Sequence, residues 1–307
     1  MSVSSITANA PALGDVASAA SGITLFRVTA ASGAIVRVSG AGARISTGSS
    51  LTTVTVACGE QDSCNKTNAN IKIGNIGTPA GRAGALGNFT VAMGSATLVS
   101  DIDGTDPIAF TIGAIGKNST ATFYVGMDLP ISGDDSGKAT GAAISGFYVY
   151  IAPSRTTPNS GSTSGRATAT VRRPITVSKS SDLNFGTVIR PRSGSGTVSI
   201  DAATGARSFT GGAINTPNTT SARAVYTIGG EGGQAFSITV PQTFAMTLGS
   251  DSLTVTTSAT AAGAHVLSSS LGSAGTFGFG VGGTLPVTNT TVTGAYSGSF
   301  NVTVNYN

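Results

Sequence analysis

Tryptophan is absent from this chain, and charged residues are scarce. Asp, Glu, Lys and Arg make up 10% of its 307 residues, against roughly 25% in an average soluble domain. Low charge indicates disorder only when hydrophobicity is also low, whereas the mean hydropathy here is positive. The 43 glycines separate short runs rich in β-branched residues. This composition predicts β-strands joined by tight turns, in a chain long enough for about two domains.

Residue types that carry enzyme chemistry are also few. His265 is the only histidine, and no G-x-S-x-G motif occurs, so a Ser-His-Asp site is not supported. Asp101, Asp103 and Asp106 lack the spacing of a calcium-binding EF-hand loop. The glycine-rich residues 229–233 lack the lysine of a phosphate loop. We therefore expect no catalytic residues, no cofactor and no metal, and interpret these segments as turns.

Nucleic acid and membrane are not expected partners. The net charge is only +4, and no block of Lys and Arg is interleaved with aromatic residues, as nucleic-acid binding would require. No segment approaches the roughly 18 consecutive apolar residues of a membrane-spanning helix.

The two cysteines, Cys58 and Cys64, flank a short polar loop in the sequence ACGEQDSC. Two cysteines are too few for a zinc site, and no CxxC redox motif is present. A disulfide would staple the ends of the loop, so we predict a structural disulfide and an oxidising compartment.

Short alternating runs bounded by Gly, Asn, Asp or Ser recur along the whole chain, as in β-sandwich proteins. Residues 153–166, PSRTTPNSGSTSGR, are polar and rich in Gly and Ser, which is typical of a linker. We predict an N-terminal extension at residues 1–30, a first sandwich at 31–152, the linker at 153–166 and a second sandwich at 167–307.

The two halves end in similar motifs. YVGMDLPI at residues 124–131 precedes GAAISGFYVYI at 141–151, and GVGGTLPV at 280–287 precedes GAYSGSFNVTVNY at 294–306. The motif that begins at residue 124 recurs at residue 280, 280 − 124 = 156 positions later. This spacing indicates duplicated domains, because solenoid repeats run about 20–50 residues. Alternation in the last motif places one set of apolar side chains on one face of a strand: Phe300, Val302, Val304 and Tyr306.

The second half resembles a known family. RPITVSKSSDLNFGTV at residues 173–188, AVYTIGGEGGQAFSITVP at 224–241 and the two closing motifs resemble the DUF4402 family of bacterial secreted proteins over about residues 165–307. The ending, with its penultimate Tyr306, also resembles that of fimbrial pilins. The resemblance implies two immunoglobulin-like, pilin-like antiparallel β-sandwiches in tandem.

In fimbrial pilins, the last strand borders a groove that an N-terminal extension of the next subunit fills. The resemblance therefore implies an extracellular filament subunit that polymerises head-to-tail with copies of itself, with a periplasmic chaperone and an outer-membrane usher as partners. Residues 167–171 are placed to close the first domain in cis, whereas no chain remains to close the second, whose groove would be formed by Phe300, Val302, Val304 and Tyr306. Residues 3–13 and 23–29 are competing donor segments. Their candidate donor residues are Val3, Ile6, Ala8, Leu13, Ile23, Leu25 and Val28.

Two other classes of function stay open. A surface adhesin or glycan-binding module would present aromatic platforms or polar pockets, although tryptophan is missing. Because residues 1–22 lack the basic start and long apolar run of a signal peptide, a virion structural protein is a third hypothesis.

Overall fold

The computed structural model describes residues 1–153, 161–216 and 220–307. The chain is all-β, the fold class that the sequence predicts, and it divides into two units, Met1–Pro174 and Ile175–Asn307. In the described ranges, no helix is long and apolar enough to cross a lipid bilayer.

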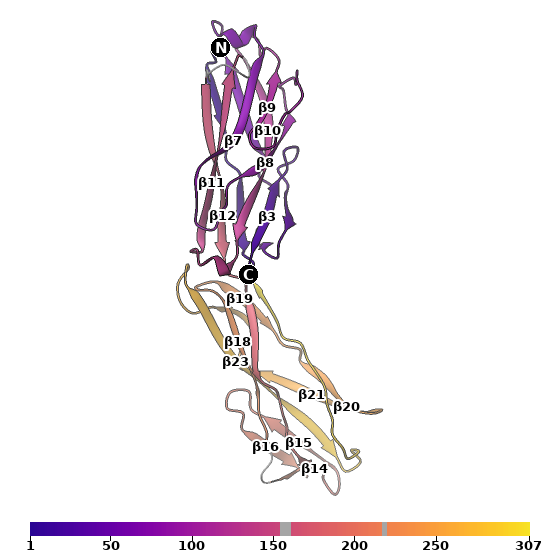
Figure 1. Ribbon diagram of the computed structural model, residues 1–307. Coiled ribbons are helices and arrows are strands. Elements are labelled where there is room, and N and C mark those ends of the chain that lie inside the picture. The colour runs from indigo at the N-terminus through magenta and orange to yellow at the C-terminus, as the bar shows by residue number, and fades with distance from the viewer. Residues whose placement is uncertain (154–160, 217–219) are drawn as a thin grey trace. The chain divides into compact units, whose positions relative to one another are not determined.

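The first unit is a sandwich of two sheets around one continuous apolar core (Figure 1). Its elements are β1 (Ser5–Ala8), β2 (Ala12–Ala17), β3 (Ile23–Val28), β4 (Ile35–Ser39), β5 (Ala43–Arg44), β6 (Thr52–Cys58), β7 (Ala69–Ala80), β8 (Gly87–Met93), β9 (Ile108–Ile112), β10 (Ser119–Ser132), β11 (Gly141–Ala152) and β12 (Gly161–Arg172), with the 3-10 helices η1 (Ser63–Asn65) and η2 (Asp134–Ser136). One sheet has the order β1-β6-β10-β3-β4, with β8 also paired to β10, and the other has the order β5-β2-β12-β11-β7-β9. Strict alternation builds these layers, since β6 buries every second residue of TTVTVAC.

Strand β12 closes the first unit from within, as predicted for residues 167–171. It runs antiparallel to β11 over its whole length and parallel to β2 on its other edge. The parallel pair departs from the purely antiparallel sandwich that the family resemblance implies. The inward residues of β12, Gly165, Ala167, Ala169 and Val171, are all buried. Gly165 carries no side chain because Phe147 of β11 already fills this space: a Cβ at Gly165 would lie 2.4 Å from Cζ of Phe147.

The chain is therefore divided differently from the sequence-based prediction. The first unit ends at Pro174, past the predicted linker of residues 153–166, because β12 hydrogen-bonds along β11 and β2. Residues 154–160 of that linker lie outside the described residues. Most of the predicted extension, residues 1–30, is paired in the first unit as β1, β2 and β3.

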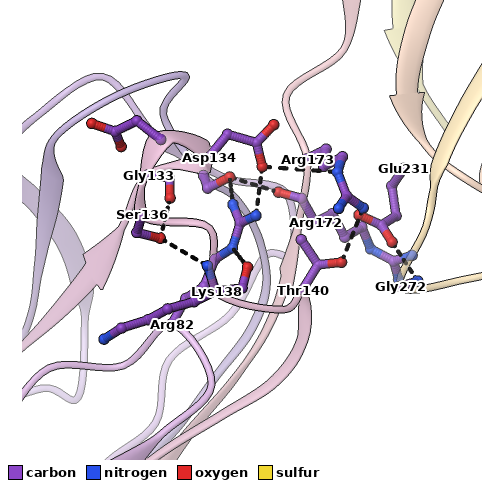
Figure 2. Close-up of polar contacts among 12 residues, drawn as sticks. Arg82, Gly133, Asp134, Ser136, Lys138, Thr140, Arg172, Arg173, Glu231 and Gly272 are labelled. Carbon is purple, nitrogen blue, oxygen red and sulfur yellow. Dashed lines mark hydrogen bonds and ion pairs between the residues drawn. The ribbon is translucent and has the colours of Figure 1, made fainter.

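A buried arginine fixes the end of the first unit where β12 finishes (Figure 2). The Arg82 side chain is 1% exposed and donates to the Asp134 carboxylate at 2.5 Å, to the Ser18 hydroxyl at 2.7 Å and to the Lys138 carbonyl at 3.0 Å. Ser18 donates in turn to the Arg172 carbonyl at 3.1 Å. Arg173, which follows β12, lies 3.9 Å from the same Asp134 carboxylate, so one carboxylate ties the loop after β10 to the end of the first unit.

The second unit forms a large sheet of order β13-β18-β23-β15-β16, in which β21 also pairs with β23 and with β20, a three-stranded sheet β22-β19-β24 and a short pair β14-β17 (Figure 1). Its strands are β13 (Thr176–Ser181), β14 (Val188–Ile189), β15 (Ser195–Ile200), β16 (Arg207–Gly211), β17 (Ile214–Asn215), β18 (Ala224–Glu231), β19 (Ala235–Thr239), β20 (Thr243–Leu248), β21 (Asp251–Ala259), β22 (Gly263–Val266), β23 (Ala274–Thr288) and β24 (Thr303–Tyr306).

The strand pairing of the two units agrees with the predicted duplication. The motifs around Val125 and Val281 lie in β10 and β23, the central strands of their sheets. Strand β10 pairs with β3, β6 and β8, and β23 pairs in the same pattern with β15, β18 and β21. Strand β11 pairs with β7 as β24 pairs with β19, and β2 pairs with β5 as β14 pairs with β17. In the described part of the second unit, no strand corresponds to β12.

We expect Val171→Asp to destabilise the first unit by about 4 kcal/mol or more, because it places a carboxylate without a partner in the core. Thr168→Asp, on the outward face of the same strand, is the control and should change stability by less than about 1 kcal/mol. Urea unfolding, monitored by hydrogen exchange of the β11 amides, measures the stability of both variants. Equal effects would show that β12 does not cover the core.

Asp134→Asn should destabilise the first unit by roughly 3–5 kcal/mol, since it leaves the buried Arg82 guanidinium without its carboxylate. Asp135→Asn is a matched control, because the Asp135 carboxylate accepts a hydrogen bond from the exposed Gly22 N–H and an asparagine keeps that acceptor. Thermal melting measures the stability of both variants, and equal melting temperatures would contradict this role for Asp134.

Candidate functional site

The last strand of the second unit lies at the edge of its sheet. Strand β24 pairs with β19, and in the described chain no strand lies on its other side. The matching strand of the first unit, β11, is covered by β7 on one edge and β12 on the other. Residues 289–302, which precede β24, form one isolated β-bridge, between Thr247 and Ser297. They lack a described neighbouring strand whose hydrogen bonds would hold them extended.

This difference changes how well β11 and β24 are buried. In β11, the inward residues Phe147, Val149 and Ile151 are fully buried in one continuous core cluster. The core of the second unit is split into two clusters. The four residues predicted to line an acceptor groove are only partly buried against one of them: Phe300, Val302, Val304 and Tyr306.

An open groove lies where β12 would stand in the second unit. Residues 183–190 form one wall and residues 291–298 the other, and they enclose a hollow of about 730 Å³. Its floor is apolar because it exposes the incomplete core: the contributing side chains are Leu183, Phe185, Val188, Met246, Leu253, Leu285 and Val287.

A smaller hollow of about 210 Å³ extends this groove toward β13. The rings of Phe244 and Phe300 line it, with their centroids 5.0 Å apart. At its rim, Lys179 forms an ion pair with Asp182. The hydrogen bond and charge of that carboxylate raise the pKa of Lys179, so the rim is charged while the floor is apolar.

This arrangement has the chemistry of a strand acceptor. An edge strand offers backbone donors and acceptors in register, and an apolar trough beside it accepts alternate side chains. The first unit shows how such a trough is filled, because β12 lies antiparallel to β11 and parallel to β2. By correspondence, the missing strand would run antiparallel to β24 and parallel to β14.

The structure divides the predicted acceptor residues into two roles. Phe300 lines the groove, whereas the Tyr306 hydroxyl accepts a hydrogen bond of 2.8 Å from the Glu231 N–H and so ties β24 to the end of β18. The sequence did not predict the opposite wall of the groove, residues 183–190. Its signal was the alternation of Leu183 and Phe185 within LNFGTV, but only the fold places that segment opposite the chain terminus.

The predicted donor residues lie in strands of the first unit. Ile6 and Ala8 face Val56 and Val54 across the β1–β6 pair, and Val3 packs against the same core. Leu13 in β2 and Val28 in β3 are fully buried. Ile23 and Leu25 belong to β3, which pairs with β10. Their role in polymerisation stays a prediction, and it would require these strands to leave their sheets.

The disulfide loop holds the N-terminal residues in place. Cys58 and Cys64 form the predicted disulfide at the end of β6. Within this loop, the Asp62 carboxylate accepts a hydrogen bond of 2.6 Å from the Ser4 hydroxyl. This bond, together with one from the Gly59 N–H, lowers the pKa of Asp62. Strand β1 is thus anchored at its start as well as along the β1–β6 ladder.

Comparison with known proteins locates the family resemblance in the second unit. The family model described as Domain of unknown function (DUF4402) matches residues 175–306, so the resemblance of this half is confirmed. No curated protein matches the chain.

Two solved structures are similar to this chain at low identity. One is the CsuC–CsuE chaperone–tip adhesion subunit pre-assembly complex from archaic chaperone–usher Csu pili of Acinetobacter baumannii, with 10% identity, a TM-score of 0.32, and coverage of 98% of this chain and 99% of that chain. The other is a chaperone–tip adhesin complex of CFA/I fimbriae, with 9% identity, a TM-score of 0.26, and coverage of 84% and 75%.

Truncating matching aromatic residues should expose the difference between the units. Phe147→Ala should cost the first unit about 3–5 kcal/mol, because it removes a fully buried ring. Phe300→Ala should cost the second unit only about 1–2 kcal/mol, because its ring is partly exposed in the groove. Hydrogen exchange of the β7 and β19 amides would report each unit separately, and a larger loss for Phe300→Ala would contradict an open groove.

Proposed function

We propose that this protein is a structural subunit of an extracellular bacterial filament, whose second unit is completed by a β-strand from another molecule. One observation carries the proposal: the second unit repeats the strand pairing of the first, with β20 added and without a described counterpart of β12, and a groove with an apolar floor lies at the position of β12. Exposed edges of this kind promote aggregation unless another strand covers them.

Strand addition also accounts for the chemistry of the groove. Main-chain hydrogen bonds to β24 would supply affinity, and the hollows beside Phe300 and Leu285 would select alternate side chains of the donor. A head-to-tail contact of this type does not close on itself, so repeated contacts produce a filament. Before assembly, the open groove needs protection, which a periplasmic chaperone would provide, and an outer-membrane usher would deliver the subunit to the cell surface.

The source of the donor strand distinguishes two arrangements. In a homopolymer, residues 1–30 of the next copy would fill the groove. In the second arrangement, this chain accepts a strand from a different subunit and ends the filament, as a surface adhesin would. The pairing of β1, β2 and β3 within the first unit, with Leu13 and Val28 fully buried, favours the second arrangement.

We expect Val292→Asp to reduce filament incorporation at least tenfold. Val292 lines the groove and is 45% exposed, so a carboxylate is tolerated there until a strand covers it and removes its water. Val177→Asp is the matched control, because Val177 is 43% exposed on β13 and lies outside the residues that line the groove.

Electron microscopy and immunoblotting of sheared surface material measure incorporation of both variants, and thermal melting checks their folding. Filaments of Val292→Asp as abundant as those of Val177→Asp would refute the proposal.

A disulfide lock decides between the two arrangements. Thr7 and Thr55 face each other across the β1–β6 pair on its outward side, at a spacing that suits a cross-strand disulfide. In the double variant Thr7→Cys/Thr55→Cys, oxidised β1 cannot leave its sheet. A homopolymer whose donor is residues 3–13 would then stop growing, whereas a subunit that only accepts a strand would still be incorporated at the wild-type level.

A further inference from the structure

The two walls of the groove in the second unit run antiparallel to each other. At one end, Leu183 and Gly298 line the same small hollow. At the other end, the Arg190 guanidinium donates a hydrogen bond of 2.8 Å to the Thr291 carbonyl of the opposite wall. The groove thus has two distinct ends, which we name the Leu183 end and the Arg190 end.

The first unit indicates the direction and register of the missing strand. Residues 13–18, LGDVAS, lie along β12, and residues 185–190, FGTVIR, form the corresponding wall of the groove. Both segments hold a glycine in the left-handed region, Gly14 at φ 73° and Gly186 at φ 68°. Both then pair with a short strand, β2 with β5 and β14 with β17. The two segments therefore match residue for residue.

In the first unit, charge and hydrogen bonding fix the end of β12. The Arg172 guanidinium lies 3.0 Å from the Asp15 carboxylate of β2. The Ser18 N–H and hydroxyl both donate to the Arg172 carbonyl, at 2.9 Å and 3.1 Å. At this position the wall is acidic and the strand that covers it is basic.

The corresponding end of the groove has the opposite charge. Thr187 takes the place of Asp15, and Arg190 takes the place of Ser18. A further hollow of about 520 Å³ lies at this end, lined in part by Arg190 and Arg192. Among the described residues that line this hollow and the groove itself, none is acidic. A basic residue like the last one of β12 would be repelled by both arginines.

Arg190 is suited to bind a carboxylate. Its side chain crosses from one wall of the groove to the other, and the hydrogen bond to Thr291 uses one of the five N–H groups of the guanidinium. Neither Arg190 nor Arg192 forms an ion pair with a residue that the structure describes. Guanidinium binds carboxylate through two parallel hydrogen bonds, and Arg192 adds a second positive charge that attracts the same group.

We propose that the strand taken up by the second unit carries an acidic residue, Asp or Glu, directly after its apolar residues, at the Arg190 end of the groove. This inference rests on the proposed function and specifies the partner: an extended segment of another subunit in which alternate apolar residues precede the acidic one. The order follows from the direction, since the strand runs parallel to residues 185–190 as β12 runs parallel to β2. At the Leu183 end, Lys179 and Asp182 already form an ion pair.

The test is binding of fluorescent peptides to the full chain, measured by fluorescence anisotropy at low salt. All peptides have the length of β12, the same alternating Val and Thr residues and an amidated C-terminus. They end in two Asp, two Asn or two Lys residues, or begin with two Asp residues. The peptide that ends in Asp should bind at least tenfold more tightly than the peptides that end in Lys or begin with Asp, with the Asn peptide between them. Added salt should reduce the difference, because it screens exposed charges.

Substitutions in the chain locate the preference. Arg190→Gln and Arg192→Gln should each reduce the ratio of Asp to Lys peptide affinities at least threefold. Lys179→Gln is the matched control, because it removes one positive charge at the Leu183 end, and it should leave the ratio unchanged. Thermal melting checks the folding of each variant. Arg192→Gln keeps the test valid if loss of the Arg190 hydrogen bond to Thr291 unfolds the second unit.

The possible failures of the two proposals differ. Equal binding of the peptides that end in Asp and in Lys, or a ratio that survives both arginine substitutions, would overturn the charge preference and leave strand uptake intact. Tighter binding of the peptide that begins with Asp would overturn the direction and therefore this inference. Absence of binding by every peptide would count against strand uptake itself, and this inference would fall with it.

Discussion

A buried β-strand needs hydrogen-bonding partners along its edges, and the organisation of this protein follows from how that need is met for β11 in the first unit and for β24 in the second. In the first unit, β12 lies against β11, and the side chains beneath it form one continuous core. In the second unit, β24 has β19 as its partner and an apolar groove on its other side. The core there is divided into two clusters as a result.

Among the described residues, the order of strands along the chain leaves the second unit without a counterpart of β12. Strand β12 follows β11 directly and closes the unit that it ends, which removes it as a partner for the second unit. The N-terminal strands are also in use, and the disulfide loop anchors β1 through Ser4 and Asp62. Among the described strands, none is free to cover the groove, and the proposed function assigns that place to a strand from another molecule.

The two units thus offer different kinds of surface. The groove of the second unit exposes backbone and apolar floor, which suit an extended peptide. In the first unit, β11 is paired on both edges, with β12 and with β7, so its outward face has side chains and not a free backbone edge to offer.

Local pattern by itself determined the strands, the disulfide between Cys58 and Cys64 and the duplication, because alternation, loop length and motif order are short-range properties. The same alternation suits a free donor segment and a strand paired in a sheet, so only the tertiary structure placed β1 to β3 inside the first unit. The composition of the residues where β12 begins indicated a linker, because glycines such as Gly165 are typical of flexible segments. In the structure, Gly165 is required because the Phe147 ring leaves no room for a side chain. The groove wall at Leu183 and Phe185 faces residues more than a hundred positions away. Pairing between such distant segments depends on which edges remain open after folding, and a one-dimensional pattern does not encode that.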